Sequence, residues 1–384
     1  MTNDRPKPGY EQPGVGVIPE DWEVALISEL TSEVGDGIHA TPLYSNNGDY
    51  YFVNGNNLLN GTIVINQDTK RAEISEFRKY RKNLTERSIL LSINGTIGNL
   101  AFYRNEPIIL GKSAAYLNVR NNISTQFFYY ALQTRNVEDF FEDGLTGTTI
   151  RNLGLGTIRN TPIDIPGDYG EQRSISQVLS DVDALIAGLD KAIDKKRAIK
   201  TATMQQLLTG KKRLPGFGEG KGYQESEIGI IPKDWDVQTL DEMCTKIQDG
   251  THFSPKIGRN DFYYITSKNI GRGFLNLSNA ERIDTAQHEA IYRRCDVKKG
   301  DLLLTKDGVN TGNAALNDLD EEFSLLSSVA LLRFKPQKYE PAYFLHLMLS
   351  SESQNRIKEL VSGNAITRLT LEKIRKILFP FPLL

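Results

Sequence analysis

Gly111, Lys112 and Ser113 form the motif in this sequence that comes nearest to a phosphate-binding loop. A loop of the Walker A type needs a further glycine five residues before the first of these three, because its backbone N–H groups cradle the phosphates. Glu106 occupies that position. The motif also follows an apolar run, so we interpret it as the start of a strand and predict no nucleotide binding there.

Two histidines, His39 and His252, end the related tetrapeptides Asp-Gly-Ile-His and Asp-Gly-Thr-His. Histidine can bind a metal ion, but a metal site needs several converging ligands, and no others lie nearby in the sequence. Aspartate in such a turn commonly hydrogen-bonds to the backbone that follows it. We therefore predict two turns in which the aspartate caps the backbone, and no metal site.

The motifs of a methyl-transfer enzyme are missing from the sequence. An amino-methyltransferase carries a Pro-Pro pair in its catalytic loop, and this chain has no such pair. The segment Phe217-Gly218-Glu219-Gly220 has the wrong spacing for a cofactor loop. We therefore expect no catalytic residues.

Composition limits the class of protein. A chain of 384 residues is long enough for two domains and a connector. Cys244 and Cys295 form no CxxC unit, so the sequence predicts neither disulfides nor zinc, and a reducing cytosol is the expected compartment. Residues 1–13 are polar, and no run is as long as a membrane span. The net charge of −2 is not that of a simple nucleic-acid binder, which is usually basic.

The chain contains an internal repeat. Residues Gly9–Val24 resemble Gly222–Val237, and the two tryptophans, Trp22 and Trp235, are 213 positions apart. The Asp-Gly-x-His turns keep this offset. Three further pairs of segments match: Tyr51–Asn57 with Tyr263–Asn269, Ile89–Asn99 with Asp301–Asn313, and Gly147–Pro166 with Gly363–Pro382. A period of this length indicates a duplicated domain and not a solenoid. We expect the tryptophans to anchor the core at the entrance of each domain.

Each copy is predicted to mix strands and helices. Short β-branched or aromatic runs bounded by Asn and Gly predict strands at Tyr50–Val53, Ile63–Ile65, Ser88–Ile93 and Tyr116–Val119. Apolar residues at helical spacing predict helices at Thr125–Phe141 and Pro341–Leu360. The predicted fold class is α/β (mixed α+β), in two tandem globular domains that span residues 15–166 and 223–382.

A long helix is predicted between the copies at Glu171–Leu208, within a spacer of residues 167–213. Its apolar residues follow alternating steps of four and three, which is the spacing of a heptad seam. The seam residues are Ile175, Leu179, Val182, Ile186, Leu189 and Ile193. Leu207, near the end of the helix, is a further residue that we expect to take part in assembly. A helix with one apolar stripe needs a partner, so we predict a coiled coil. The alternative is a helix that packs on its own domain.

The same helix carries a family resemblance. Residues 171–186, EQRSISQVLSDVDALI, and residues 204–213, MQQLLTGKKR, resemble the central conserved region of type I restriction–modification specificity subunits. The IPEDW and IPKDW openings and the Asp-Gly-x-His turns also resemble the target-recognition domains of that family. The resemblance covers nearly the whole chain.

The resemblance implies a role in sequence-specific recognition of double-stranded DNA. Each repeat would be a target-recognition domain that reads one half of a bipartite, asymmetric target. The helix would hold the two halves at a fixed separation. It would also dock two modification (adenine methyltransferase) subunits, and restriction subunits would join the complex. Self-association through the helix is also expected. The subunit would bind no cofactor, because S-adenosylmethionine, ATP and Mg²⁺ would bind partner subunits only, and it would be cytoplasmic with no membrane partner.

The resemblance departs from the family pattern after the second repeat. Members of the family usually carry a second helix there, which packs antiparallel on the first. This sequence stops at Phe379–Leu384, where the first copy continues from Pro166 into Glu171 and Gln172. We expect either a truncated chain or a helix that another polypeptide supplies.

Polar loops at equivalent places in the two copies are the candidate DNA-binding sites. Asn, Arg and Lys read base edges, and hydroxyl and basic groups bind phosphates. The candidates are His39, Asn54, Asn56, Asn57, Asn94, Thr148, Arg151 and Asn152 in the first copy and His252, Ser267, Lys268, Asn269, Lys306, Asn310, Asn313, Thr367 and Arg368 in the second. Two other interpretations stay open: a structural adaptor that dimerises through its helix, and a stand-alone DNA methyltransferase, against which the missing motifs argue.

Overall fold

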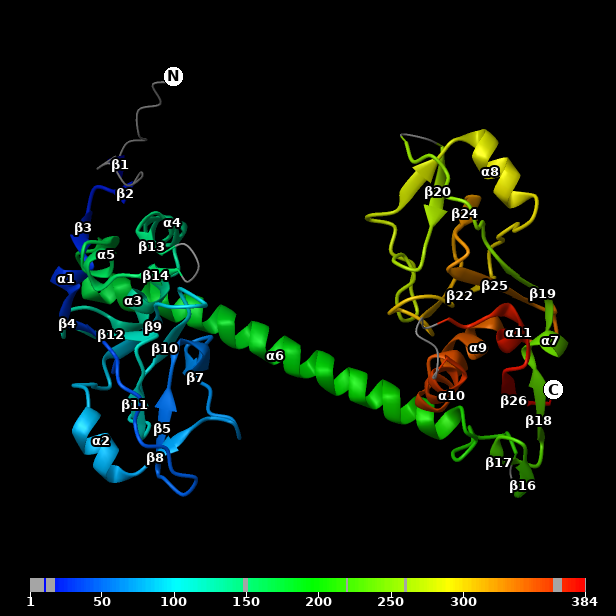
Figure 1. Ribbon diagram of the computed structural model, residues 1–384, viewed down its shortest axis with the longest axis horizontal. Coiled ribbons are helices and arrows are strands. Elements are labelled where there is room, and N and C mark those ends of the chain that lie inside the picture. The colour runs from blue at the N-terminus through cyan, green and yellow to red at the C-terminus, as the bar shows by residue number, and fades with distance from the viewer. Residues whose placement is uncertain are drawn as a thin grey trace. The chain divides into compact units, whose positions relative to one another are not determined.

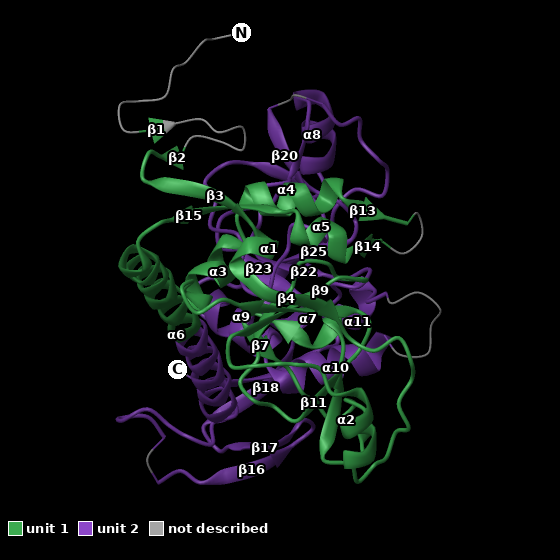
Figure 2. Cartoon of the chain, turned by 90° about the vertical axis from the view of Figure 1, so that its left-hand side faces the viewer, with its two compact units in different colours: residues 1–189 green, residues 190–384 purple. Residues whose placement is uncertain are grey.

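The computed structural model describes residues 10–11, 18–147, 151–218, 220–258, 261–361 and 368–383. The chain divides into two compact units, residues 1–189 and 190–384, which Figure 2 shows in different colours. Each unit contains one copy of the repeat. The fold is therefore mixed helix and sheet in two tandem domains, as predicted from the sequence.

A four-stranded antiparallel sheet forms the centre of the first unit (Figure 1). Its strands, in spatial order, are β10 (Leu100–Phe102), β9 (Ser88–Ser92), β12 (Ala114–Val119) and β4 (Thr31–Asp36). Both β9 and β12 are buried along their whole length, which explains their apolar and small residues. A second sheet has the order β11 (Ile108–Leu110), β5 (Tyr50–Val53) and β8 (Arg71–Ala72), and its β11–β5 pair is parallel.

Smaller elements of the first unit connect and cover these sheets. The strands are β1 (Tyr10–Glu11), β2 (Ile18–Pro19), β3 (Trp22–Leu26), β6 (Leu58–Leu59), β7 (Thr62–Ile63), β13 (Leu145–Thr146), β14 (Asn152–Leu153) and β15 (Pro162–Pro166). The helices are α1 (Ile27–Leu30), η1 (Gly55–Asn57), α2 (Ile74–Tyr80), α3 (Thr125–Ala131), α4 (Arg135–Asp143) and α5 (Leu155–Arg159).

The second unit repeats this topology. Its four-stranded sheet has the order β19 (Cys244–Asp249), β25 (Val329–Phe334), β22 (Leu302–Thr305) and β23 (Ala314–Leu316), equivalent to β4, β12, β9 and β10. Its second sheet is β21 (Glu281–Ile283), β20 (Phe262–Ile265) and β24 (Phe323–Leu325), with β20–β24 parallel. The matching registers fix residue equivalences: Asp36 and Asp249 pair with Ala115 and Ala330 respectively.

The remaining elements of the second unit also have counterparts in the first. The strands are β16 (Tyr223–Ser226), β17 (Gly229–Pro232), β18 (Trp235–Thr239) and β26 (Leu378–Pro382). The helices are α7 (Leu240–Met243), α8 (Thr285–Tyr292), α9 (Pro341–Met348), α10 (Ser351–Val361) and α11 (Leu371–Arg375).

Each unit has its own core. Helices α3 and α9 pack against their four-stranded sheets through Phe128 and Phe344, both of which are almost fully buried. The predicted tryptophan anchors differ in detail. Trp235 is buried, whereas Trp22 is half-buried and its Nε1 donates a hydrogen bond to Oε1 of Glu171 at 3.3 Å. Both make edge-to-face ring contacts, with Phe127 and with Tyr343.

Two predicted helices are each broken in the structure, so those single-helix predictions were wrong. The segment Thr125–Phe141 divides into α3 and α4, because the extended backbone of Thr134 starts a new helix and its hydroxyl donates to the carbonyl of Ala131. The segment Pro341–Leu360 divides into α9 and α10, where Ser350 accepts a hydrogen bond from the backbone N–H of Ser353. A local hydroxyl that competes for helix backbone groups explains both breaks.

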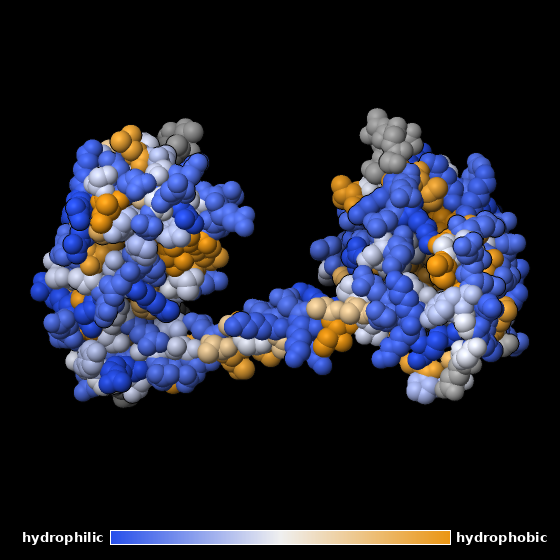
Figure 3. Space-filling model, turned by 90° about the horizontal axis from the view of Figure 1, so that it is seen from below, coloured by the Kyte–Doolittle hydropathy of each residue, from blue (hydrophilic) through white to orange (hydrophobic). Residues whose placement is uncertain are grey.

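The long helix α6 runs from Tyr169 to Leu207, 39 residues, close to the predicted Glu171–Leu208 (Figure 1). Its start is anchored in the first unit through Gln172, whose side chain accepts from the N–H of Ser124 and donates to the carbonyl of Pro166. Its end belongs to the second unit, where Leu208, just after the helix, packs on the core. The seam residues Val182, Ile186, Leu189 and Ile193 are 47–55% exposed, and Figure 3 shows apolar surface along this helix.

Candidate nucleic-acid interface

The candidate loops of the first unit meet at one end of its central sheet. This is the end at which β9 and β4 finish and β12 begins. Just after β9, Asn94 forms a bridge with Asn152, and the N–H of Leu153 donates to the carbonyl of Ile93 at 2.9 Å. The N–H of Gly55 donates to Oγ of Ser113, just before β12, at 2.9 Å. Three loops that lie far apart in the sequence therefore form one surface.

The second unit brings its loops together in the same way. Asp307, the equivalent of Asn94, forms a bridge with Arg368, the equivalent of Asn152. The N–H of Ser267 donates to Oγ of Ser328 at 3.2 Å, and Nδ2 of Asn310 donates to the carbonyl of Ser267 at 3.3 Å. The sequence-predicted loops are thus assembled at the same strand end in both units.

The Asp-Gly-x-His turns lie at this end too, but their hydrogen bonding differs from the prediction. The aspartate faces the histidine: Nε2 of His39 is 2.7 Å from Oδ2 of Asp36, and Nε2 of His252 is 3.2 Å from Oδ2 of Asp249. Both histidines are exposed.

Backbone packing explains the glycine in each turn. A Cβ at Gly37 would lie 2.1 Å from the carbonyl oxygen of Gly111, and a Cβ at Gly250 would lie 1.9 Å from that of Leu325. Any side chain would therefore collide with the neighbouring parallel strand. The turn residues match in the two repeats because the turn passes so close to the second sheet.

Three candidate residues are buried and serve the loops from inside. Asn57 accepts a hydrogen bond from the N–H of Asn54 and donates to the carbonyl of Val64. Asn269 makes the equivalent bonds with Thr266 and Asn276. The third is Lys306. Their polar atoms bond to their own domain, which makes them supports of the loop in this conformation.

The other described candidates reach the surface to different degrees. Asn56, Arg151, Lys268 and Arg368 are exposed, like the two histidines, and Asn54, Asn94, Asn152, Ser267, Asn310 and Asn313 are half-buried. Arg151 forms an ion pair with Glu142 at 2.8 Å. Asn54 accepts from Oγ of Ser113, and Nδ2 of Asn313 donates to the carbonyl of Ile270. Thr148 and Thr367 lie outside the described residues.

A buried charge cluster distinguishes the second unit from the first. Nζ of Lys306 lies 3.6 Å from Oδ2 of Asp249 and 3.0 Å from Oδ2 of Asp307. Asp249 also pairs with Arg294 at 2.9 Å, and Asp307 pairs with Arg368 at 3.4 Å. The first unit has the buried Ile93 where the second has Lys306. Sequence reasoning placed Lys306 among surface contacts; the aligned isoleucine was the available sign that its side chain is buried.

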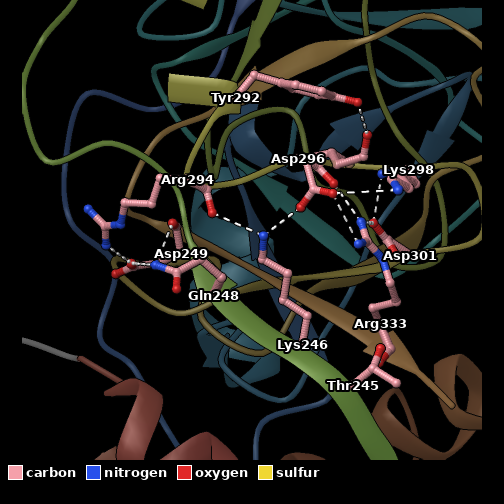
Figure 4. A network of polar contacts seen from close by, with 11 residues as sticks. Thr245, Lys246, Gln248, Asp249, Tyr292, Arg294, Asp296, Lys298, Asp301 and Arg333 are labelled. Atoms are coloured by element: carbon pink, nitrogen blue, oxygen red, sulfur yellow. Dashed lines mark hydrogen bonds and ion pairs between the residues drawn. The ribbon is translucent and has the colours of Figure 1, made fainter. Parts of the chain in front are cut away.

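A second ion-pair network extends from this cluster along the sheet (Figure 4). Asp296 contacts Nζ of Lys246 at 2.5 Å and a terminal nitrogen of Arg333 at 3.2 Å, and Arg333 also pairs with Asp301 at 2.8 Å. Burial favours the neutral form of Asp296, but the hydrogen bonds from Lys246 and Arg333 outweigh it and lower its pKa to about 2. At the equivalent positions the first unit has one carboxylate, Glu33, which accepts hydrogen bonds from the neutral Asn83 and Asn118, and Ser88 donates to Asn118.

The described residues offer little for metal or thiol chemistry. No group of three or more His, Cys, Asp or Glu side chains among them gathers as a metal site. Cys244 and Cys295 are free and buried, and burial raises the pKa of each thiol to about 12. In the described part of the chain, no helix has the length and apolarity to cross a membrane.

Comparison with known proteins identifies a family that this chain matches. Residues 19–196 and 232–384 match the family model described as "Type I restriction modification DNA specificity domain". The type I restriction enzyme MjaVIII specificity subunit of Methanocaldococcus jannaschii is 26% identical over 95% of this chain and 83% of its own length. The MjaIX specificity subunit of the same organism is 22% identical over 98% of this chain and 86% of its own length.

A solved structure has the same fold. The crystal structure of the S subunit of a type I restriction–modification system from M. genitalium has a TM-score of 0.57 at 17% identity. The similarity covers 94% of this chain and 85% of that one.

Proposed function

The chain belongs to the family of type I restriction–modification DNA specificity subunits, with two domains, and on that premise we propose that each domain reads one half of a bipartite DNA target. The two half-sites differ in sequence, so the whole target is asymmetric. One observation carries the proposal most directly. Equivalent loops meet at the same strand end in both domains, but the chemistry of their residues differs.

The contrast between shared scaffold and different loops supports two independent readings. The first domain presents Asn94 and Asn152 where the second presents Asp307 and Arg368. Amide and guanidinium groups recognise different base edges in the major groove, so such a substitution changes the preferred base. The turn glycines and buried loop asparagines are common to both domains, because they maintain the scaffold and not the specificity.

The net charge of the chain also bears on the proposal. At −2, the chain as a whole offers no excess of positive charge to the phosphate backbone, which dominates the affinity of most DNA-binding proteins. We propose that partner subunits supply much of the phosphate contact. High affinity therefore belongs to the assembled complex, and the specificity subunit contributes the choice of sequence.

Helix α6 is the proposed docking element for modification subunits, two in the assembled complex. Its apolar seam is exposed from Val182 to Ile193, whereas Ile175 and Leu208, towards the two ends, pack against the cores of the two domains. An exposed stripe of this kind needs a partner helix. Restriction subunits join the same complex, and two copies of the chain associate through this seam when no modification subunit is present.

We propose that the chain itself performs no chemistry. S-adenosylmethionine, ATP and Mg²⁺ bind the partner subunits, and the chain holds no cofactor. The cytoplasm, where DNA and the partners lie, is its proposed location.

The experiment is a methylation assay in two steps. The purified full chain is incubated with DNA and labelled S-adenosylmethionine, first alone and then with a modification subunit co-expressed from a neighbouring gene. We expect methyl transfer only in the second case, at adenines within one two-part sequence. Methyl transfer by the chain alone, or transfer at unrelated sequences in the complex, would contradict the proposal.

A further inference from the structure

Arg368 occupies a position in the second domain where both its backbone and its side chain tie it to the strand end. It forms a bridge with Asp307, and the N–H of the next residue, Leu369, donates to the carbonyl of Lys306 at 2.8 Å. Nε of Arg368 lies 3.4 Å from Oδ1 of Asp307, and its side chain is 53% exposed. The arginine is therefore anchored at its base and reaches solvent with the rest of its side chain.

Asp307 is held from the opposite side by the buried lysine. Its Oδ2 is 3.0 Å from Nζ of Lys306, which is only 2% exposed and is shared with Asp249. Among the described residues, no hydrogen bond of good geometry reaches the buried Oδ1 of Asp307. Arg368 is its ion-pair partner. A buried carboxylate oxygen is costly without a donor, so it draws the guanidinium toward itself.

This arrangement leaves a defined set of donors for a ligand. A guanidinium has its N–H groups in a fixed planar fork, and contact through Nε leaves the two terminal nitrogens as donors on the far edge. Two parallel donors match the N7 and O6 acceptors of guanine in the major groove. Holding the side chain in advance lowers the entropy lost on binding, which strengthens such a contact.

We propose that Arg368 reads a guanine in the half-site of the second domain, and that Lys306 and Asp307 are positioning residues for it. This inference rests on the proposed function, namely that the second domain reads DNA. The equivalent residue of the first domain, Asn152, bridges to Asn94 and has Ile93 behind it in place of the lysine. That pair of amides cannot present the same donors, so the first domain does not read guanine in this way.

The alternative role for an exposed arginine is a phosphate contact. A phosphate contact carries no sequence information, so its loss weakens binding to all sequences alike. Loss of a bidentate contact with guanine instead reduces the preference at one base pair by about 5- to 150-fold. The two roles are therefore separated by which sequences are affected.

The test is selection from a random duplex library by the full chain in complex with its modification subunit. Four proteins are compared: the unaltered chain, Arg368→Ala, Arg368→Lys and Asp307→Asn. The control is Lys299→Ala, which removes one positive charge from an exposed ion pair with Asp320 at 2.8 Å. Lys299 precedes β22, at the opposite end of the strand from Lys306, so the control leaves the loops untouched.

We expect Arg368→Ala to lose the preference for guanine at one position of the second half-site and to keep the first half-site unchanged. Arg368→Lys should not restore it, because an ammonium lacks the planar fork, and Asp307→Asn should weaken it partly. Lys299→Ala should select the same target as the unaltered chain. An equal loss of binding to all sequences, or an unchanged target for Arg368→Ala, overturns the inference alone. If the unaltered complex selects no sequence, the proposed function fails, and this inference fails with it.

Discussion

Asp249 and Lys306 form an ion pair inside the second domain, with Oδ2 and Nζ 3.6 Å apart and side chains only 6% and 2% exposed. In the first domain, the same strand position holds Ile93, which is also buried. The same scaffold thus accepts either an isoleucine or an ion-paired lysine just after the strand, at the end where the candidate loops meet. This difference leads to the first prediction.

Replacing Lys306 by methionine should destabilise the second domain strongly. The change removes a buried cation that contacts both Asp249 and Asp307, and leaves them paired with the exposed Arg294 and Arg368. Breaking a buried pair from one side costs about 3–5 kcal/mol, and the remaining arginine pairs make this an upper bound. Chemical denaturation of the full chain would measure the loss. The triple variant Lys306→Ile, Asp249→Asn, Asp307→Asn removes the charges together and should cost less than the single change. A single variant as stable as the unaltered chain would contradict this view of the cluster.

The stability of the second domain should fall in acid. Asp296 has its pKa lowered from an ordinary 3.8 to about 2, so its charged form favours the folded state. Such a contribution is fully present above the pKa of the unfolded chain and is lost as the pH falls from about 4 through 2. The shift corresponds to roughly 2 kcal/mol.

Denaturation curves between pH 2 and pH 6 would measure this dependence for the unaltered chain and for Asp296→Asn. The variant should lose stability at pH 6 and show a shallower decline toward pH 2. Asp320→Asn is the matched control, because Asp320 forms an exposed pair with Lys299. An identical pH dependence in Asp296→Asn and the unaltered chain would show that this carboxylate is not the source.

An alanine at Gly37 should disturb the first Asp-Gly-x-His turn. Its Cβ would lie 2.1 Å from the carbonyl oxygen of Gly111, so the backbone must move, at a cost of about 1–3 kcal/mol. Gly154→Ala in the same domain is the control, because nothing lies within 4 Å of the added Cβ. Thermal unfolding should distinguish the two. Equal stability of both variants would show that the turn does not pass so close to the neighbouring strand.

The apolar seam of α6 should be needed for assembly and not for folding. Ile186 is 53% exposed, so Ile186→Asp removes no core contact. Burying such a side chain against a partner is worth about 1.5–3 kcal/mol, which an aspartate would forfeit. Analytical ultracentrifugation should show self-association, or pairing with the modification subunit, in the unaltered chain and its loss in the variant. Asp190→Ala, on the same exposed helix, should have little effect. A monomer that also fails to bind modification subunits before any mutation would contradict the proposed role of the helix.

The repeat and the elements of strong pattern could be predicted from the sequence. The strand Tyr50–Val53 has the predicted bounds, and α6 begins two residues before the prediction and ends one residue before it. These segments have strong local signals, namely β-branched or aromatic runs and a long heptad pattern. The end of α3 was missed because Thr134 acts through one hydroxyl, which the apolar periodicity does not register.

The candidate site could be predicted from sequence only at the level of loops. The three loops were identified in each repeat, and their meeting at one strand end depends on strand order, which local patterns do not determine. The burial of Asn57 and Asn269 was missed because an asparagine that supports a loop has the same sequence signature as one that faces DNA. Lys306 has two carboxylate partners. Asp307 is its neighbour in the sequence, whereas Asp249 lies far away in the sequence, at the end of β19, and only the fold brings it to Lys306.

The most direct test of the central claim is exchange of the first domain. Residues 15–166 are replaced by the corresponding domain of another family member with a different target, and the methylated sites of the complex are mapped. The account predicts that one half-site changes to that of the donor while the other half-site stays as it was. A change in both halves, or no change in either, would contradict independent reading by the two domains.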